Sequence, residues 1–260
     1  AVNNGSGTYV AWCWKAGGTA VSNTEGTITS QVSANTEAGF SIVTYTGNGT
    51  AGATIGHGLG AIPQVVIVKR RSGTEDWMVG IGPILGSGEE GHYVKLNTTA
   101  SKATGNGPFN STNPSSSLVT LGSDVATNQN TDTYITYCWT EIPGYSKFGK
   151  YTGNGNDNGP FINLGFRPAW IMFKLADGGA DDWPIYDIKR DPINVCDHRL
   201  FANTDTAEGA VGQEHFDILS NGIKFRKQKN PFNNSGKVYI YMAFAEQPGT
   251  TPFATFPNAR

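Results

Sequence analysis

The chain has 260 residues, of which 15% are charged and 34 are glycine, and its formal net charge is −2. This balance, without a basic cluster or a long apolar run, predicts neither a nucleic-acid partner nor insertion into a membrane. The abundance of Gly, Asn, Thr and Ser is typical of short strands joined by polar turns rather than of helices.

The chain begins with an alternating segment that recurs twice. It reads YVAWCWKA at 9–16, YITYCWTE at 134–141 and YIYMAFAE at 239–246. Large apolar residues share one face of each copy, and this period of two predicts a strand. The other face carries Cys13, Cys138 and Ala243, so we expect close packing there and thiols that act as small apolar groups.

The first copy has no complete unit of its own, and we therefore expect the chain to be a segment of a longer protein. Trp12 and Trp14 would form an exposed apolar stripe if this strand stayed unpaired. The segment is predicted either to add as a strand to the first unit or to pair with a neighbouring subunit.

An internal repeat runs through the rest of the chain. Identical residues recur 106 positions apart: YTGNG at 45–49 and 151–155, Asp-Trp at 76–77 and 182–183, and Asn-Thr at 97–98 and 203–204. The repeat predicts two units, 39–141 and 142–248. Residues 1–38 would hold the closing strand of a preceding repeat plus a connector, and 249–260 an extended tail.

The fold class expected from this repeat is all-β, with two tandem β-sandwich units (jelly-roll or Ig-like) of about 105 residues. Strands are predicted in the second unit at 147–151, 161–164, 169–174, 183–187, near 200, 215–219, 223–226 and 237–245. Asn221-Gly222 within LSNGIKF is the favoured two-residue turn of a hairpin.

The duplicated YTGNG could in principle be a phosphate loop, but neither copy is followed by a sequence that can start a helix. Its glycines are therefore predicted to supply positive φ in a turn. In the second copy, Asn154, Asn156 and Asn158 imitate a calcium loop, but the first position lacks a carboxylate and the closing glutamate is missing.

No group of residues in the sequence indicates catalysis. The four histidines do not recur between the units, and neither HExxH, GxSxG nor CxxC occurs. Glu89-Glu90 and Asp181-Asp182 are neighbours in sequence, so on a strand they would face opposite sides. We expect no enzyme activity, no metal and no cofactor.

The repeated Asp-Trp pair allows two interpretations. It can be structural, with the Asp in a turn and the Trp at the start of a strand. It can also form a platform on which an exposed indole stacks against a sugar while nearby polar groups orient hydroxyls. The candidate ligand-binding residues are Asp182, Trp183, Tyr186, Asp187, Arg190, Asp76 and Trp77.

Several phrases of the sequence, from YVAWCWKAGG through GYSKFGKYTGNG and GPFINLGFRPAW to YIYMAFAE, carry a family likeness. They resemble a repeated β-rich domain in virion proteins of tailed phages that infect cyanobacteria and other marine bacteria. The resemblance covers Tyr9 to Glu246. That family often has Tyr-His soon after the Trp of the first unit, where this chain has Val79-Gly80.

The resemblance implies a non-enzymatic protein of the virion surface: a tail fibre, spike or capsid-decorating protein that serves assembly and host attachment. Its partners would be copies of itself, other virion proteins and a host surface glycan. The alternative, taken from the Asp-Trp cluster, is a carbohydrate-binding module of a secreted or surface-attached protein.

Overall fold

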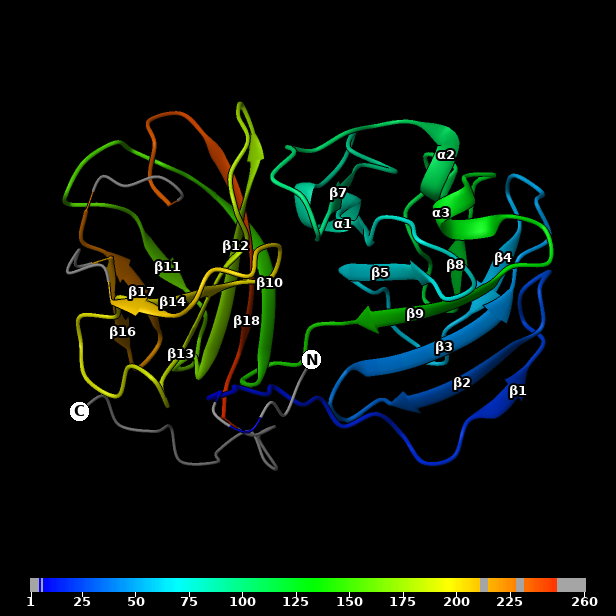
Figure 1. Cartoon of the computed structure of the whole chain (residues 1–260), viewed down its shortest axis with the longest axis horizontal. Coiled ribbons are helices and arrows are strands. Elements are labelled where there is room, and N and C mark those ends of the chain that lie inside the picture. Colours follow the sequence, from blue (N-terminus) through cyan, green and yellow to red (C-terminus); the bar gives the residue numbers. More distant parts are fainter. Residues whose placement is uncertain (1–4, 6, 211–214, 228–231, 247–260) are drawn as a thin grey trace.

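The computed structural model describes residues 5, 7–210, 215–227 and 232–246. It is mostly antiparallel β-structure in two groups of sheets that lie side by side (Figure 1), which confirms the predicted all-β class at this level. Three single turns of helix interrupt the first group: α1 (Gly82–Leu85), α2 (Asn106–Phe109) and α3 (Val125–Asn128). Within the described residues, no helix has the length and apolar character needed to cross a membrane.

The first group contains a seven-stranded sheet in the order β1-β2-β3-β9-β5-β6-β7 and a two-stranded sheet of β4 and β8. Its strands are β1 (Val21–Asn23), β2 (Ser30–Asn35), β3 (Phe40–Thr46), β4 (Thr54–Gly56), β5 (Val65–Arg70), β6 (Met78–Gly80), β7 (Tyr93–Lys95), β8 (Leu118–Thr120) and β9 (Thr133–Trp139). β1 and β2, which precede the predicted first unit, 39–141, also pair into this sheet.

The second group contains a six-stranded sheet, β10-β18-β12-β13-β14-β15, and a three-stranded sheet, β11-β17-β16. Its strands are β10 (Ser146–Thr152), β11 (Phe161–Asn163), β12 (Trp170–Asp177), β13 (Pro184–Asp187), β14 (His198–Phe201), β15 (Gly209–Ala210), β16 (Phe216–Leu219), β17 (Gly222–Phe225) and β18 (Val238–Phe244). A strand lies at each of the eight predicted places, and β15 was not predicted.

The hairpin between β16 and β17 is present, but its turn lies one residue earlier than predicted. Leu219 pairs with Gly222, so the two turn residues are Ser220 and Asn221. Gly222 begins β17 instead, at a point where a Cβ atom would come within 2.0 Å of the carbonyl oxygen of Ile162. The glycine is therefore needed for the close approach of β11 and not for the turn.

The two large sheets share one arrangement of strands. The order β3-β9-β5-β6-β7 in the first matches β10-β18-β12-β13-β14 in the second. The repeated closing strand is β9 in one sheet and β18 in the other, and each is paired on both sides. Its small residues face the inner core of each group, where Cys138 and Ala243 are fully buried. Burial raises the pKa of the Cys138 thiol to about 12, as expected of a small apolar group in a core.

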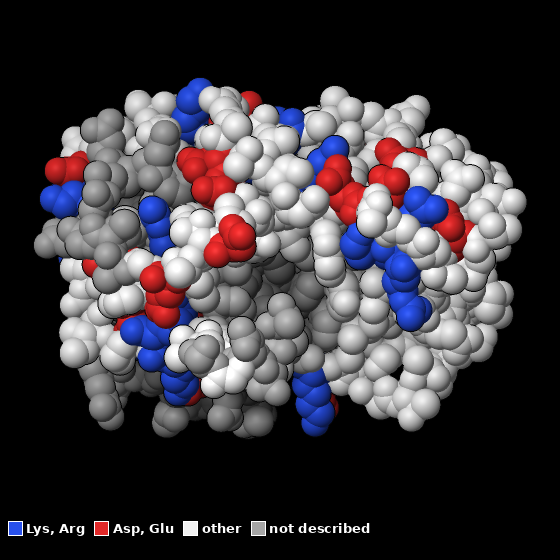
Figure 2. Space-filling view, viewed as in Figure 1, with Lys and Arg blue, Asp and Glu red and all other residues white. Residues whose placement is uncertain are grey.

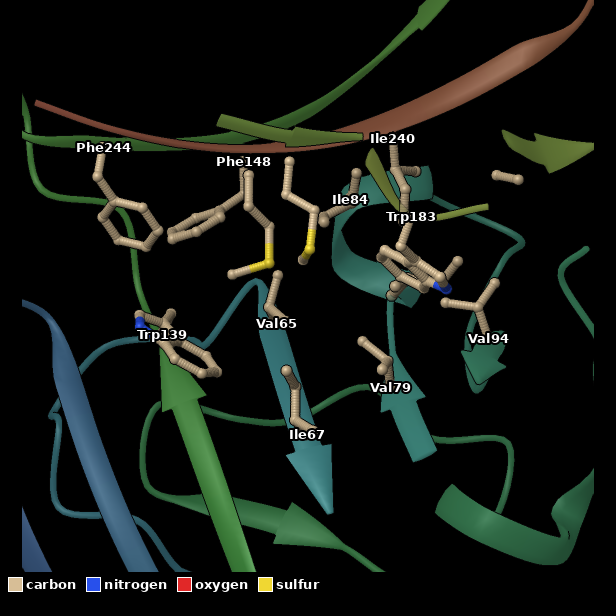
Figure 3. Packing of buried hydrophobic residues seen from close by; sticks show 14 of the residues in the cluster. Val65, Ile67, Val79, Ile84, Val94, Trp139, Phe148, Trp183, Ile240 and Phe244 are labelled. Carbon is tan, nitrogen blue, oxygen red and sulfur yellow. The ribbon is translucent and has the colours of Figure 1, made fainter. Parts of the chain in front are cut away.

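The outer faces of the two large sheets pack directly against each other, and we call this contact the seam. Figure 3 shows side chains from both sheets meeting there. Examples are Val65, Ile67 and Trp139 from the first sheet and Phe148, Ile240 and Phe244 from the second. The central strands of each large sheet are therefore buried on both faces, which explains the bulky apolar residues along the outer face of β9 and β18.

The N-terminal segment, residues 7–16, does not form a strand in the first sheet, so that prediction is wrong. It lies extended along the seam, with Trp14 packed edge-to-face against Trp139 and Trp170 at ring distances of 6.1 Å and 5.2 Å. The open edges of the first sheet are β1 and β7, which have three residues each and offer little backbone for pairing. The seam instead provides apolar surface for the tryptophans. Pairing with a neighbouring subunit stays a prediction.

The YTGNG loops are turns, and each surrounds a buried asparagine. Gly49 and Gly155 have φ of 70° and 65°, as predicted. Asn128 is fully buried, accepts from the amide of Asn48 at 3.0 Å and donates to the carbonyl of Thr50 at 2.9 Å. In the second group, Asn233 is also fully buried, accepts from the amide of Asn154 at 2.8 Å and donates to the carbonyl of Asn156 at 2.8 Å.

Replacing Asn128 with alanine should lower the free energy of unfolding by about 2–3 kcal/mol, because buried backbone groups lose their partners. Asn233→Ala should cost a similar amount. Urea unfolding measures both, and Asn130→Ala, which changes an exposed neighbour, should cost less than about 0.5 kcal/mol. Equal stability of Asn128→Ala and Asn130→Ala would show that the buried amide does not hold the turn.

Candidate functional site

The repeated Asp-Trp pair makes the same contacts in both sheet groups. Asn97 accepts from the amide of Trp77 at 3.0 Å and donates to Asp76 at 2.8 Å. Asn203 accepts from the amide of Trp183 at 2.9 Å and donates to Asp182 at 2.7 Å. A lysine, Lys69 or Lys174, lies over each indole at 5.9 Å and 5.6 Å. The pair is thus one part of a duplicated structural clasp of Asp, Trp, Asn and Lys.

The two tryptophans differ in their surroundings. Trp183 is 2% exposed, lies within the seam and donates from Nε1 to the carbonyl of Lys95 in the first group at 3.0 Å. Trp77 is half-buried at the edge of the seam. The expectation of an exposed Trp183 face for stacking is therefore wrong, since the other sheet group covers the ring.

The other predicted residues around Trp183 do not share one surface. Alternation along β13 places Tyr186 on the opposite face of the sheet from Trp183, where it is fully buried and its hydroxyl meets Nδ1 of His215 at 2.9 Å. Asp187 and Arg190 form an ion pair at 2.7 Å with little exposure of either side chain. Strand alternation thus divides the predicted cluster, and ligand binding by its members stays a prediction.

Asp187 connects the N-terminal segment to the second sheet. It accepts from Nε1 of Trp12 at 3.1 Å and from Nε of Arg190 at 2.7 Å, and the Arg190 guanidinium lies 5.7 Å from the Trp12 ring. Burial acts to raise the pKa of Asp187, but the hydrogen bonds and charge of Arg190, together with the Trp12 indole, bring it below its usual value. The ionised carboxylate therefore helps to hold the segment in place.

A groove with a volume of about 360 Å³ lies along the seam, and we call it the aromatic groove. Five of the six tryptophans of the chain line it: Trp12, Trp14, Trp77, Trp139 and Trp170. Its other lining residues are apolar or aromatic too, and none is charged. On the face seen in Figure 2, charged side chains are grouped around a hollow between the two halves of the molecule.

Two tryptophans of this groove have an indole N–H group without a hydrogen-bond acceptor among the described residues. The Nε1 atoms of Trp139 and Trp170 are buried and have no hydrogen-bond acceptor among the described residues. Both rings pack edge-to-face against Trp14. The alternating faces that carry Trp12, Trp14 and Trp139 are visible in the sequence, but no signal in the sequence shows that they meet in one groove.

Lys174 is a charged residue that is buried at the seam. It is fully buried and donates to the carbonyl oxygens of Thr99, at 2.8 Å, and of Asp181. Burial lowers the pKa of Lys174 to about 8, although the carboxylates of Asp181 and Asp182 act in the opposite direction.

This shift predicts a pH dependence of stability. Between about pH 8 and the ordinary lysine range, near 10.5, the folded state binds fewer protons than the unfolded state, so the Lys174 contribution to stability rises with pH. Below pH 8 it is at its lowest. The free energy of unfolding of the native chain relative to Lys174→Met should rise across that window by at most about 3 kcal/mol. Urea unfolding at a series of pH values measures this, and parallel curves would contradict it.

Two histidine sites have structural contacts. His57 is fully buried, its Nε2 lies 3.2 Å from the carbonyl oxygen of Ser115, and burial lowers its pKa.

Among the described residues, one group could hold a metal: Asp191, Asp197 and His198. Nδ1 of His198 meets Asp191 at 2.6 Å, and this hydrogen bond raises the pKa of His198. Asp191 also accepts from two backbone amides, so these contacts already satisfy its carboxylate.

Comparison with known proteins gives one match. A family profile described as "Domain of unknown function (DUF7483)" matches residues 1–248, so the chain belongs to this family. No curated protein and no solved structure matches the chain.

Proposed function

We propose that this member of the DUF7483 family is a non-enzymatic structural protein of a phage virion surface. It would be a tail fibre, spike or capsid-decorating protein that assembles with copies of itself and other virion proteins and takes part in host attachment. On this proposal, its two sheet groups are tandem copies of one β-sandwich unit.

The observation that carries the proposal is that the repeated polar residues make the same structural hydrogen bonds in both sheet groups. The Asp-Trp-Asn-Lys clasp and the YTGNG turn with its buried asparagine have matching hydrogen bonds in both groups. These matches support a duplicated unit whose repeated residues serve stability. The resemblance of the sequence to virion domains of marine phages supports the same function.

The packing at the seam also supports a structural role. Apolar side chains of both large sheets pack into one cluster at the seam, which joins the two groups, and the YTGNG turns contain exposed residues. Such an arrangement suits a spacer that must hold its shape while its loops vary.

The test is the composition of purified virions. Mass spectrometry of particles that carry the gene should detect this chain together with the other structural proteins. Antibodies against the exposed loop at 154–158 should label the particle surface in electron micrographs. Absence of the chain from purified particles would contradict the proposal.

The alternative function, a carbohydrate-binding module, is favoured by one observation: Trp77 is the copy of the clasp that reaches the groove edge. A glycan array tests it with the native chain, Trp77→Ala and Trp183→Ala. A glycan signal lost in Trp77→Ala would favour the module. A signal that survives both substitutions would exclude the Asp-Trp pair as its source, and no signal at all is the result expected of a purely structural role.

A further inference from the structure

The aromatic groove has the size and chemistry of a ligand site. Its volume, about 360 Å³, lies in the range of small-molecule pockets, roughly 300–1,000 Å³. Its walls provide aromatic rings and aliphatic side chains, and the seam behind them is packed. A sugar would need several polar groups in the wall to orient its hydroxyls, and the lining residues offer almost none. The walls therefore favour a hydrocarbon.

A positive charge lies beside Trp77, one of the residues that line the groove. Lys69 is two residues beyond Ile67 on β5, so both side chains are on the seam face of the strand, and Ile67 lines the groove. The Lys69 ammonium is 5.9 Å from the ring of Trp77, another lining residue. An anionic group bound beside Trp77 would therefore come within reach of this charge.

The matching lysine of the second group shows why Lys69 is suited to this role. Lys174 is fully buried and donates to two carbonyl oxygens. Lys69 is half-buried and, within the described part of the chain, donates to one carbonyl oxygen, that of Glu75, at 2.6 Å. An ammonium group has three donors, so Lys69 can make a further hydrogen bond to a ligand.

Among the described residues, Lys69 forms no ion pair of its own, although Asp76 is close enough for its charge to attract the ammonium. Asp76 is paired with Lys95 at 2.7 Å, and Glu75 lies near Arg70 at 3.5 Å. In the second group, the corresponding ammonium of Lys174 is inside the seam, and Arg190, which lies 5.7 Å from the Trp12 ring, is paired with Asp187.

We infer that the aromatic groove binds a single-chain amphiphile with an anionic head group, such as a fatty acid. The hydrocarbon chain lies along the tryptophans, and the carboxylate meets Lys69. The volume accommodates a chain of roughly a dozen carbons if each methylene takes about the space of one water molecule, ~30 Å³. Binding of this kind does not depend on whether the protein resides in a virion.

The tryptophans themselves report occupancy. Dodecanoate carrying a terminal bromine, titrated below its micelle concentration, should quench the intrinsic fluorescence in a saturable way, because five of the six tryptophans line the groove. Calorimetry with plain dodecanoate should give a one-to-one stoichiometry. Quenching that rises linearly without saturation would overturn the proposal.

Variants of the protein distinguish binding of the hydrocarbon tail from binding of the anionic head group. Trp77→Ala should weaken binding of both dodecanoate and neutral dodecanol. Lys69→Met keeps the aliphatic stem and should weaken dodecanoate by about fivefold to tenfold while leaving dodecanol unchanged. The matched control is Lys147→Met, because Lys147 is also a strand lysine that donates to a carbonyl oxygen. Its neighbour on β10, Phe148, lies in the seam, so the Lys147 side chain is on the opposite face of the sheet. Lys147→Met should leave both affinities unchanged.

Thermal melts show whether each variant is folded. A folded Lys69→Met that binds dodecanoate as the native chain does would overturn the placement of the head group. Loss of dodecanoate binding in Lys147→Met would show attraction by general charge and would overturn the site. A dimer in sedimentation experiments that excludes the probe would instead assign the groove to a second copy of the chain and overturn the proposal.

Discussion

Trp183→Ala should lower the free energy of unfolding by about 3–5 kcal/mol, the usual cost of removing a fully buried tryptophan. The ring is 2% exposed in the seam and its Nε1 donates to Lys95 of the other sheet group. Its loss leaves a cavity between the groups and an unpaired carbonyl. Urea unfolding followed by circular dichroism measures the change.

Trp77→Ala is the matched control, because the same clasp of Asp, Asn and Lys surrounds it. Since Trp77 is half-buried at the groove, its replacement should cost only about 1–2 kcal/mol. Equal losses for the two variants would mean that the clasp, and not the seam, determines the stability contributed by these tryptophans.

Removing residues 1–16 should lower the free energy of unfolding by about 2–4 kcal/mol, because the segment covers apolar surface of the seam. Trp14 contacts Trp139 and Trp170, and Trp12 donates to Asp187. The double variant Trp12→Ala/Trp14→Ala should reproduce most of this loss. Val10→Ala, at a position 42% exposed, should change stability by less than about 0.5 kcal/mol.

Melting temperature and oligomeric mass, measured together, distinguish the two ways in which the segment could act. A lower melting temperature at unchanged mass is expected from docking within the chain. A fall in mass would indicate pairing between subunits. A truncated chain with unchanged melting temperature and mass would show that the segment contributes nothing, in contradiction to its contacts in the seam.

The local features of this protein follow from its sequence alone. Strand positions in the second group, the two closing strands β9 and β18 with their alternating faces, and the positive φ of Gly49 and Gly155 were predicted correctly. Each depends on neighbours within a few residues: a period of two, or a turn that only glycine fits well. The duplicated hydrogen bonds of the clasp likewise join residues that recur at a constant spacing.

The partners of the apolar faces were decided by the tertiary structure. Asp76-Trp77 and Asp182-Trp183 are identical in sequence, yet one ring lines a groove and the other is buried by the neighbouring sheet group. The N-terminal segment has the sequence of a closing strand but lies along the seam. Alternation shows that a face is apolar, but hydrophobic burial has no direction, so the identity of the covering surface depends on how distant segments fit together.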